Sequence, residues 1–131
     1  MNLEQLLERM RGNPMFMQNV ADWEVIPARE GVYAPWPAGM KQPLIDALKS
    51  RGIERLYIHQ AKAIEHVLKG EDIVVVTPTA SGKTLCYNVP VIGEILDNPS
   101  SRALYLFPTK PLARDQVAEI NELIDKMGAD V

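Results

Sequence analysis

The feature that most constrains the fold is a loop of small residues between an apolar run and a helical pattern. The run Ile73 to Val76 is β-branched and leads into Thr-Pro-Thr-Ala-Ser-Gly-Lys-Thr over residues 77–84. A run that is apolar on both faces is typical of a central parallel strand. Small residues let backbone N–H groups curve around phosphate oxygens, and a following helix start adds unpaired donors and a favourable dipole. The strand–loop–helix order therefore predicts a phosphate-binding loop.

The loop chemistry predicts a nucleoside triphosphate site. Lys83 would place its charge on the β- and γ-phosphates, and the Thr84 hydroxyl would be a Mg²⁺ ligand, so we expect both to be catalytic. The loop departs from the general pattern because Thr77 stands where Gly usually begins it. A strand-to-helix turn with an exposed lysine is the alternative. The expected cofactor-binding residues of the loop are Thr79, Ala80, Ser81, Gly82, Lys83, Thr84 and Leu85.

The rest of the chain alternates between strand and helix patterns. Residues 3–11 have an amphipathic helical spacing, and residues 13–40 form a Pro- and Gly-rich arm that is apolar enough to lie against a core. Helices are expected from Pro43 up to Gly52, over 59–69, over 83–96 and over 111–127, and strands over 73–77 and 103–107. This order predicts an α/β fold with a parallel sheet and flanking helices. We divide the chain into an irregular N-terminal arm, 1–40, and a nucleotide-binding part, 41–131.

Composition limits the class of protein, its compartment and its partners. A chain of 131 residues with 47% hydrophobic and 24% charged residues is of ordinary globular type. The single cysteine, Cys86, excludes an internal disulfide and favours a core role in a reducing compartment. No secretory start or membrane-length apolar run is evident, so we expect a cytoplasmic location and no membrane partner. Because the net charge is −3, nucleic acid would have to bind a local basic patch.

Two segments that flank the phosphate loop make the functional prediction more specific. Upstream, Gly52-Ile-Glu-Arg-Leu-Tyr57-Ile-His-Gln60 places a glutamine at the start of a helix. A glutamine amide can pair with the N6/N7 edge of adenine, and we predict that role for Gln60. Tyr57 could stack on the base or pack under the helix, and His59 is expected to cap or position the helix. Downstream, residues 102–114 carry Arg102, Lys110 and Arg114 and no acid, a local basic patch suited to phosphates.

The phosphate loop, the glutamine segment and Pro108-Thr-Lys-Pro-Leu-Ala-Arg-Asp-Gln116 resemble motifs of superfamily 2 DEAD/DExH-box helicases. Region 24–116 looks closest to the branch of bacterial mitomycin-repair and RecQ-like helicases with a distinctive C-terminal zinc-binding domain. The resemblance implies the N-terminal part of a first RecA-like domain, ATP with Mg²⁺ as cofactors, and a second RecA-like domain as partner. It also implies nucleic acid, DNA more than RNA, as the substrate. The nucleic-acid-binding residues that it implies are Pro108, Thr109, Lys110, Arg114 and Gln116.

One part of the helicase pattern is missing. After Thr84 no Asp-Glu-x-His run follows an apolar strand, although hydrolysis needs such acids as well as the phosphate loop. We therefore expect the 131-residue chain to be the N-terminal piece of a larger helicase and to be inactive alone. A regulatory or nucleic-acid-binding module that keeps the loop without an ATPase cycle is the main alternative. A short P-loop phosphotransferase is a weaker one, because that class normally begins the loop with Gly.

Overall fold

The computed structural model describes residues 2–78 and 81–128, which fall into two units, 1–30 and 31–131. In the first unit, α1 (Leu3–Arg11) begins at Asn2, whose side chain accepts a hydrogen bond from the Gln5 amide in a capping box. A short helix, α2 (Pro14–Met17), follows. The Arg11 guanidinium lies 4.8 Å from the centre of the Trp23 ring, a cation–π contact that joins α1 to the chain after α2.

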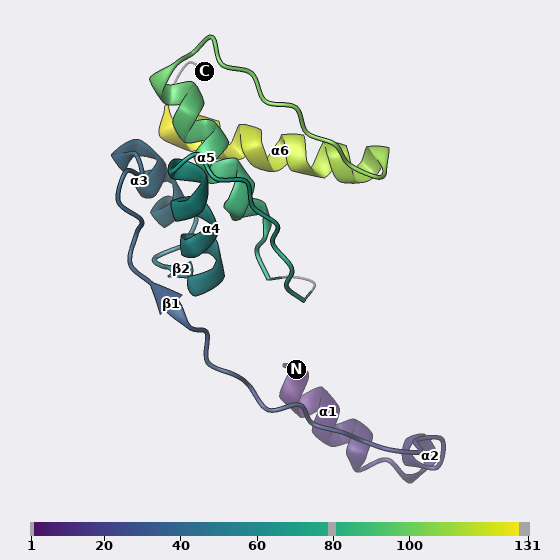
Figure 1. The fold of residues 1–131 in the computed structure, drawn as a ribbon. Helices are drawn as coiled ribbons and strands as arrows, with labels where there is room; N and C mark the ends of the chain where they lie inside the picture. The colour runs from purple at the N-terminus through teal and green to yellow at the C-terminus, as the bar shows by residue number, and fades with distance from the viewer. Residues whose placement is uncertain (1, 79–80, 129–131) are drawn as a thin grey trace. The chain divides into compact units, whose positions relative to one another are not determined.

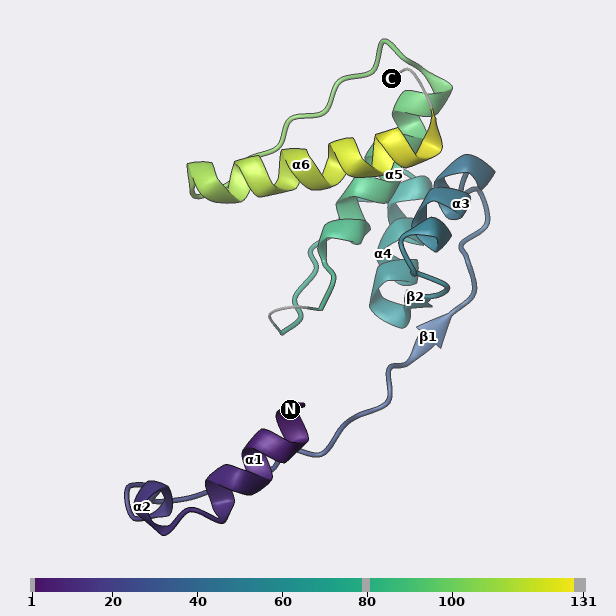
Figure 2. The same cartoon turned by 180° about the vertical axis from the view of Figure 1, so that it is seen from behind.

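The second unit consists mainly of four helices, which Figure 1 shows from one side and Figure 2 from the other. They are α3 (Gln42–Ser50), α4 (Ile58–Leu68), α5 (Thr84–Asp97) and α6 (Lys110–Met127). Proline in the first turn starts both α3 and α6, as its fixed φ favours. All the helices expected from the sequence are confirmed, with ends that differ by one or two residues.

The core of the second unit lies between α3, α4, α5 and the C-terminal half of α6. Its fully buried apolar side chains come from each of these helices and from the segment before α4. They include Leu44, Leu48, Leu56, Ile64, Val89, Ile92 and Leu123. Ala34 and Trp36 of the arm pack against this cluster, whereas Val25 and Ile26 are largely exposed. The expectation that the arm lies against a core is therefore confirmed for its C-terminal part, where Ala34, Trp36 and Met40 pack against the cluster.

The parallel sheet expected from the sequence is not confirmed. The described residues hold one two-stranded antiparallel sheet, in which β1 (Tyr33–Ala34) pairs with β2 (Leu56–Tyr57). Residues 73–77 and 103–107 run outside any strand and form no backbone hydrogen bond to another described segment. A strand is assigned only when a neighbour completes its ladder, and neither segment has one here.

Both segments nevertheless have the side-chain alternation of a half-covered strand. Val74 and Val76 are 90% and 87% exposed, and Leu104 and Leu106 are 86% and 84% exposed. The residues between them are half-buried. Since successive side chains of extended chain point to opposite sides, each segment has one covered and one uncovered face.

Within the described residues, no helix combines the length and apolarity required to cross a membrane.

Candidate functional site

The ammonium group of Lys83 lies at the centre of the phosphate loop. Its Nζ donates to the carbonyl oxygens of Thr77, at 3.0 Å, and Pro78, at 2.8 Å. It also lies 3.2 Å from Thr77 Oγ1 and 3.3 Å from Ser81 Oγ, and these two hydroxyls are hydrogen-bonded to each other. The lysine is therefore half-buried and held by oxygen atoms of its own loop, which argues against a lysine directed freely into solvent.

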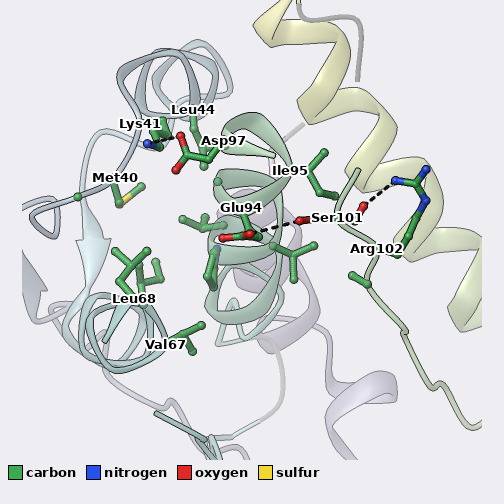
Figure 3. Close-up of a pocket in the computed structure, with 17 residues that line it drawn as sticks. Met40, Lys41, Leu44, Val67, Leu68, Glu94, Ile95, Asp97, Ser101 and Arg102 are labelled. Carbon is green, nitrogen blue, oxygen red and sulfur yellow. Dashed lines mark hydrogen bonds and ion pairs between the residues drawn. The ribbon is translucent and has the colours of Figure 1, made fainter. Parts of the chain in front are cut away.

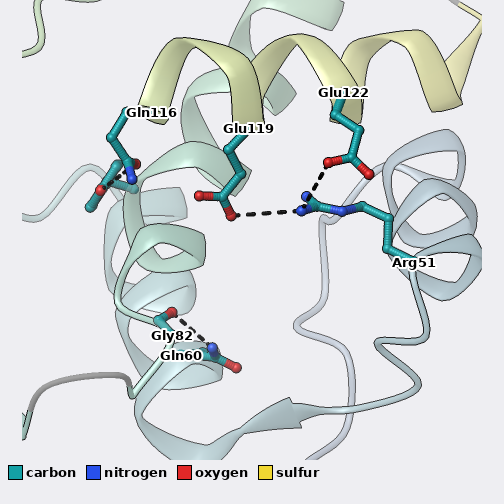
Figure 4. A network of polar contacts seen from close by, with 7 residues as sticks. Arg51, Gln60, Gly82, Gln116, Glu119 and Glu122 are labelled. Carbon is teal, nitrogen blue, oxygen red and sulfur yellow. Dashed lines mark hydrogen bonds and ion pairs between the residues drawn. The ribbon is translucent and has the colours of Figure 1, made fainter. Parts of the chain in front are cut away.

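The glutamine segment is attached directly to this loop. Gln60 is 3% exposed, and its Nε2 donates to the Gly82 carbonyl oxygen at 2.9 Å (Figure 4). Its Oε1 accepts from the Tyr57 amide at 2.9 Å. His59 Nε2 lies 2.9 Å from the Ser81 carbonyl oxygen. Because a carbonyl can only accept, this ring nitrogen carries the hydrogen. The amide nitrogen of Gln60 thus holds the loop and its oxygen caps the start of α4, so pairing with adenine stays a prediction.

Three aromatic rings form a stack beside the loop. Tyr57 lies between Tyr33 and His59, with centroid distances of 5.0 Å and 5.8 Å and nearly parallel planes. The Arg55 guanidinium lies over the Tyr33 ring, 4.4 Å from its centroid. Hydrogen bonding and then charge from Tyr33 raise the pKa of Tyr57, which keeps its phenol neutral at ordinary pH. Tyr57 therefore packs within a stack in this structure, and whether a base stacks on it is untested.

The end of the loop leads into α5. Thr84 is the first residue of that helix and is half-buried. Its hydroxyl makes no hydrogen bond to the described part of the chain. Leu85 is 7% exposed and belongs to the core cluster. Burial raises the pKa of the Cys86 thiol, as expected of a small core residue. The predicted cofactor-binding residues Thr79 and Ala80 lie outside the described residues.

The predicted nucleic-acid element begins where residues 103–107 end. Pro108, Thr109, Lys110 and Arg114 are exposed, and Thr109 caps α6 by accepting from the Leu112 amide at 3.5 Å. Gln116 differs from these four, because its Oε1 accepts a hydrogen bond from the Tyr87 hydroxyl at 2.9 Å. The structure thus groups Thr109, Lys110 and Arg114 at one helix start and directs the Gln116 amide oxygen toward α5.

Sequence reasoning missed several residues that the structure brings to the loop. Thr77 contacts the lysine ammonium through its hydroxyl, and Tyr33 reaches the ring stack from the arm. Thr77 could have been found, because it departs from the usual Gly at the first loop position. No local pattern identifies Tyr33, because its partner Tyr57 is distant in sequence and the two meet only when β1 pairs with β2.

A separate cavity of about 330 Å³ lies between α3, α4 and α5 (Figure 3). Its walls are mostly apolar, and three polar contacts border it. Lys41 pairs with Asp97 at 2.6 Å, Ser101 donates to Glu94 at 3.2 Å, and Arg102 donates to the Ser101 carbonyl oxygen at 2.8 Å. None of the predicted site residues lines it, so it does not serve the loop chemistry.

Comparison with known proteins agrees with the geometry of the loop. The family model described as DEAD/DEAH box helicase matches residues 57–131. An uncharacterized ATP-dependent helicase, YprA of Bacillus subtilis, is 50% identical over 130 residues, covering 99% of this chain and 17% of the relative. The ATP-dependent helicase hrq1 of Schizosaccharomyces pombe is 35% identical over 129 residues, covering 96% of this chain and 12% of the relative.

A solved structure is similar over the whole chain. The crystal structure of the DUF1998 helicase MrfA bound to DNA and AMPPNP matches with a TM-score of 0.81 and 50% identity. The match covers 100% of this chain and 18% of that chain. This likeness supports the RecA-like helicase fold that the sequence predicted, although the described residues hold no parallel sheet. The chain spans between 12% and 18% of these three relatives. By its motifs, its loop geometry and the family match over more than half its length, the chain belongs to the DEAD/DEAH box helicase family.

Proposed function

We propose that residues 1–131 are the ATP-binding segment of a longer ATP-dependent DNA helicase. The observation that carries the proposal is the position of the Lys83 ammonium, which lies among four oxygen atoms of the loop. A cation held on the concave side of a loop at a helix start is suited to bind a polyphosphate. The relatives are named as ATP-dependent helicases, which supports the same function.

The residues of the loop fit a nucleotide with its Mg²⁺. The backbone N–H groups of Gly82 and Lys83 donate to no acceptor among the described residues, which leaves them for phosphate oxygens. Thr84 would be the protein ligand of Mg²⁺, because its hydroxyl lies at the helix start and has no other described partner. The described residues hold no group of three or more His, Cys, Asp or Glu side chains able to bind a metal alone. Bound Mg²⁺ would neutralise charge on the β- and γ-phosphates.

DNA would bind at the start of α6. Lys110 and Arg114 would contact phosphates, and Pro108 and Thr109 would shape the turn that presents them; Gln116 remains a predicted contact through its amide nitrogen. Such contacts are independent of base sequence and weaken as salt rises. MrfA has been solved bound to DNA, which supports DNA rather than RNA. A second RecA-like domain as partner and a cytoplasmic location are further parts of this proposal.

The uncovered faces of residues 73–77 and 103–107 support a larger sheet in the longer protein. Large apolar side chains that are more than 80% exposed are costly in water, and an unpaired strand edge accepts a neighbour readily. We infer that additional strands pair with these segments in the longer protein and complete the parallel sheet expected from the sequence.

The proposal is tested with the Lys83→Ala substitution. In a longer helicase chain, we expect Lys83→Ala to weaken binding of Mg²⁺–ATP by at least about tenfold, as measured with a fluorescent ATP analogue. DNA-stimulated ATP hydrolysis should then be lost. Lys69→Ala, at an exposed residue just after α4, is the matched control and should change neither quantity.

The 131-residue chain by itself should show no DNA-stimulated turnover. Turnover by this short chain would contradict the assignment of hydrolysis to parts beyond it. A longer chain whose activities all survive Lys83→Ala would instead favour a nucleic-acid-binding or regulatory module without an ATPase cycle.

A further inference from the structure

Two neighbouring residues of α5 hold the chain on both sides of the predicted DNA element. The Tyr87 hydroxyl donates to Gln116 Oε1 at 2.9 Å, on α6 after the element. The Tyr105 hydroxyl, before the element, donates to Asn88 Oδ1 at 3.1 Å. Tyr87 and Asn88 are adjacent, and they lie one helical turn after Thr84, where the phosphate loop ends. One turn of α5 therefore contacts both flanks of the segment from Pro108 to Arg114.

The contact between Tyr105 and Asn88 gives a buried polar side chain its hydrogen-bond partner. Asn88 is 1% exposed, and a polar side chain at that depth needs a hydrogen-bond partner. Burial, and next the charge of Tyr87, raise the pKa of Tyr105, so its hydroxyl remains a donor over the ordinary pH range. The Tyr105 ring also meets the Tyr87 ring edge-to-face at 5.9 Å and stacks on Phe107 at 6.0 Å. These contacts fix the path of residues 105–107 against α5.

The first half of α6 has little other support. In both views of the fold, the Lys110 end of α6 projects beyond the other helices (Figures 1 and 2). The opposite half is held by the buried Leu123 and by Arg51, whose guanidinium lies 3.9 Å from Glu119 and 3.5 Å from Glu122 (Figure 4). Across the described residues, the Tyr87–Gln116 contact is the side-chain hydrogen bond that ties the first half of α6 to another element.

We propose that Tyr87 and Asn88 are positioning residues that couple the phosphate loop to the DNA element through the first turn of α5. The inference rests on the proposed function, because it assumes nucleotide at the loop and DNA at the start of α6. A helix moves as a rigid body over a single turn. A displacement of Thr84 when phosphate binds therefore reaches Gln116 and Tyr105 through these two side chains.

The decisive variant is Tyr87→Phe in the full-length helicase chain, because it removes the hydroxyl and keeps the ring. We expect basal ATP hydrolysis to be unchanged. We also expect the stimulation of hydrolysis by single-stranded DNA to fall by about 2- to 10-fold, the range that one neutral hydrogen bond can supply. The change in DNA affinity caused by a non-hydrolysable ATP analogue should shrink by a similar factor, because coupling between two binding sites is reciprocal.

Substitutions at Gln116 separate the hydrogen bond from other effects. Gln116→Ala should reduce the coupling as Tyr87→Phe does, and the double variant should lose little more than either single one, since both remove the same bond. Gln116→Glu keeps an oxygen that can accept from Tyr87, but its charge lowers DNA affinity directly. Its coupling is therefore measured as the ratio of DNA affinities with and without the ATP analogue, and this ratio should stay near the wild-type value. Asn121→Ala, at an exposed residue of the same helix, is the matched control and should behave as the wild type.

The outcomes distinguish this inference from the proposed function. If the full-length wild-type helicase shows no DNA-stimulated ATP hydrolysis, the proposed function fails, and the coupling role fails with it. If the wild type is stimulated and Tyr87→Phe and Gln116→Ala are stimulated equally, only the coupling role is overturned. Additive losses in the double variant would also overturn it. Should Tyr87→Phe fold poorly in thermal unfolding, the comparison of Gln116→Ala with Gln116→Glu decides alone.

Discussion

At Gly82 the backbone has a φ of +73°, and a Cβ atom there would lie 2.5 Å from Gln60 Nε2. The first property favours glycine because other residues adopt left-handed backbone only at a cost of roughly 1–2 kcal/mol. The second requires glycine because Gln60 must approach closely to bind the Gly82 carbonyl. A single position thus shapes the phosphate loop and accepts the contact from the glutamine segment.

The Gly82→Ala substitution should lower the free energy of unfolding by about 2–3 kcal/mol, the sum of backbone strain and the displaced Gln60 contact. Gly52→Ala is the matched control, because Gly52 has a φ of +82° with no atom near its Cβ position. It should cost only about 1–2 kcal/mol. The double variant Gly82→Ala with Gln60→Ala should regain part of the free energy of unfolding that Gly82→Ala alone loses. Urea unfolding measures all three variants against the wild type, and equal losses for both glycine substitutions would argue against the steric role of Gln60.

At the scale of elements, the helices could be predicted and the strands could not. Each helix carries its own signals, such as proline in the first turn of α3 and of α6 and the Asn2 capping box of α1. Residues 73–77 have the composition of a strand, but a strand also needs a neighbour, which composition does not provide. β1 and β2 were missed for a related reason, because a two-residue bridge leaves almost no pattern.

The same distinction applies to the site. Lys83, Thr84 and Gln60 could be predicted, because local motifs mark them. The contacts of Tyr87 with Gln116 and of Asn88 with Tyr105 could not, because each joins α5 to a residue that is distant in sequence. Whether Gln60 reads adenine could not be settled from the motif, since the same amide also has partners inside the protein.

Arg51 provides an element-scale test, because it joins the end of α3 to two glutamates of α6. Its side chain is 19% exposed, and Nη1 is buried without a hydrogen-bond partner among the described residues. Arg51→Met removes the charge together with this unmet donor, so we expect a loss below about 1 kcal/mol. The double substitution Glu119→Gln and Glu122→Gln leaves the arginine charge unpaired and should cost more, about 1–2 kcal/mol. Lys41→Met changes a more exposed ion pair and is the control. A larger loss for Arg51→Met than for the double glutamine variant would contradict the argument.

At the scale of the whole molecule, the second unit buries its helices well and leaves two extended segments half covered. Leu48, Leu56 and Ile64 are fully buried, whereas Val74 and Leu104 are largely exposed. The structure therefore has a helical core on one side of these segments and an apolar surface on the other. This arrangement is what a sheet lacking some of its strands and one covering layer would leave.

The exposed valines test that interpretation. Val74→Thr combined with Val76→Thr should cost less than about 0.5 kcal/mol in the 131-residue chain, because both side chains are already in water. Val89→Thr, at a residue 2% exposed, is the control and should cost about 1–3 kcal/mol. In a longer helicase chain, the double substitution should become as costly as the control. Thermal unfolding of both lengths measures this, and an unchanged small cost in the longer chain would show that the face stays uncovered there.

The ammonium of Lys83 is already surrounded by oxygen atoms of its own loop. An arriving triphosphate must therefore compete with these internal partners, and its affinity reflects an exchange of one set of contacts for another. When the triphosphate leaves, the Lys83 ammonium can return to its contacts with the loop oxygens. Its charge is therefore not left unpaired. If nucleotide binds here as proposed, a loop built this way favours its release over its permanent retention.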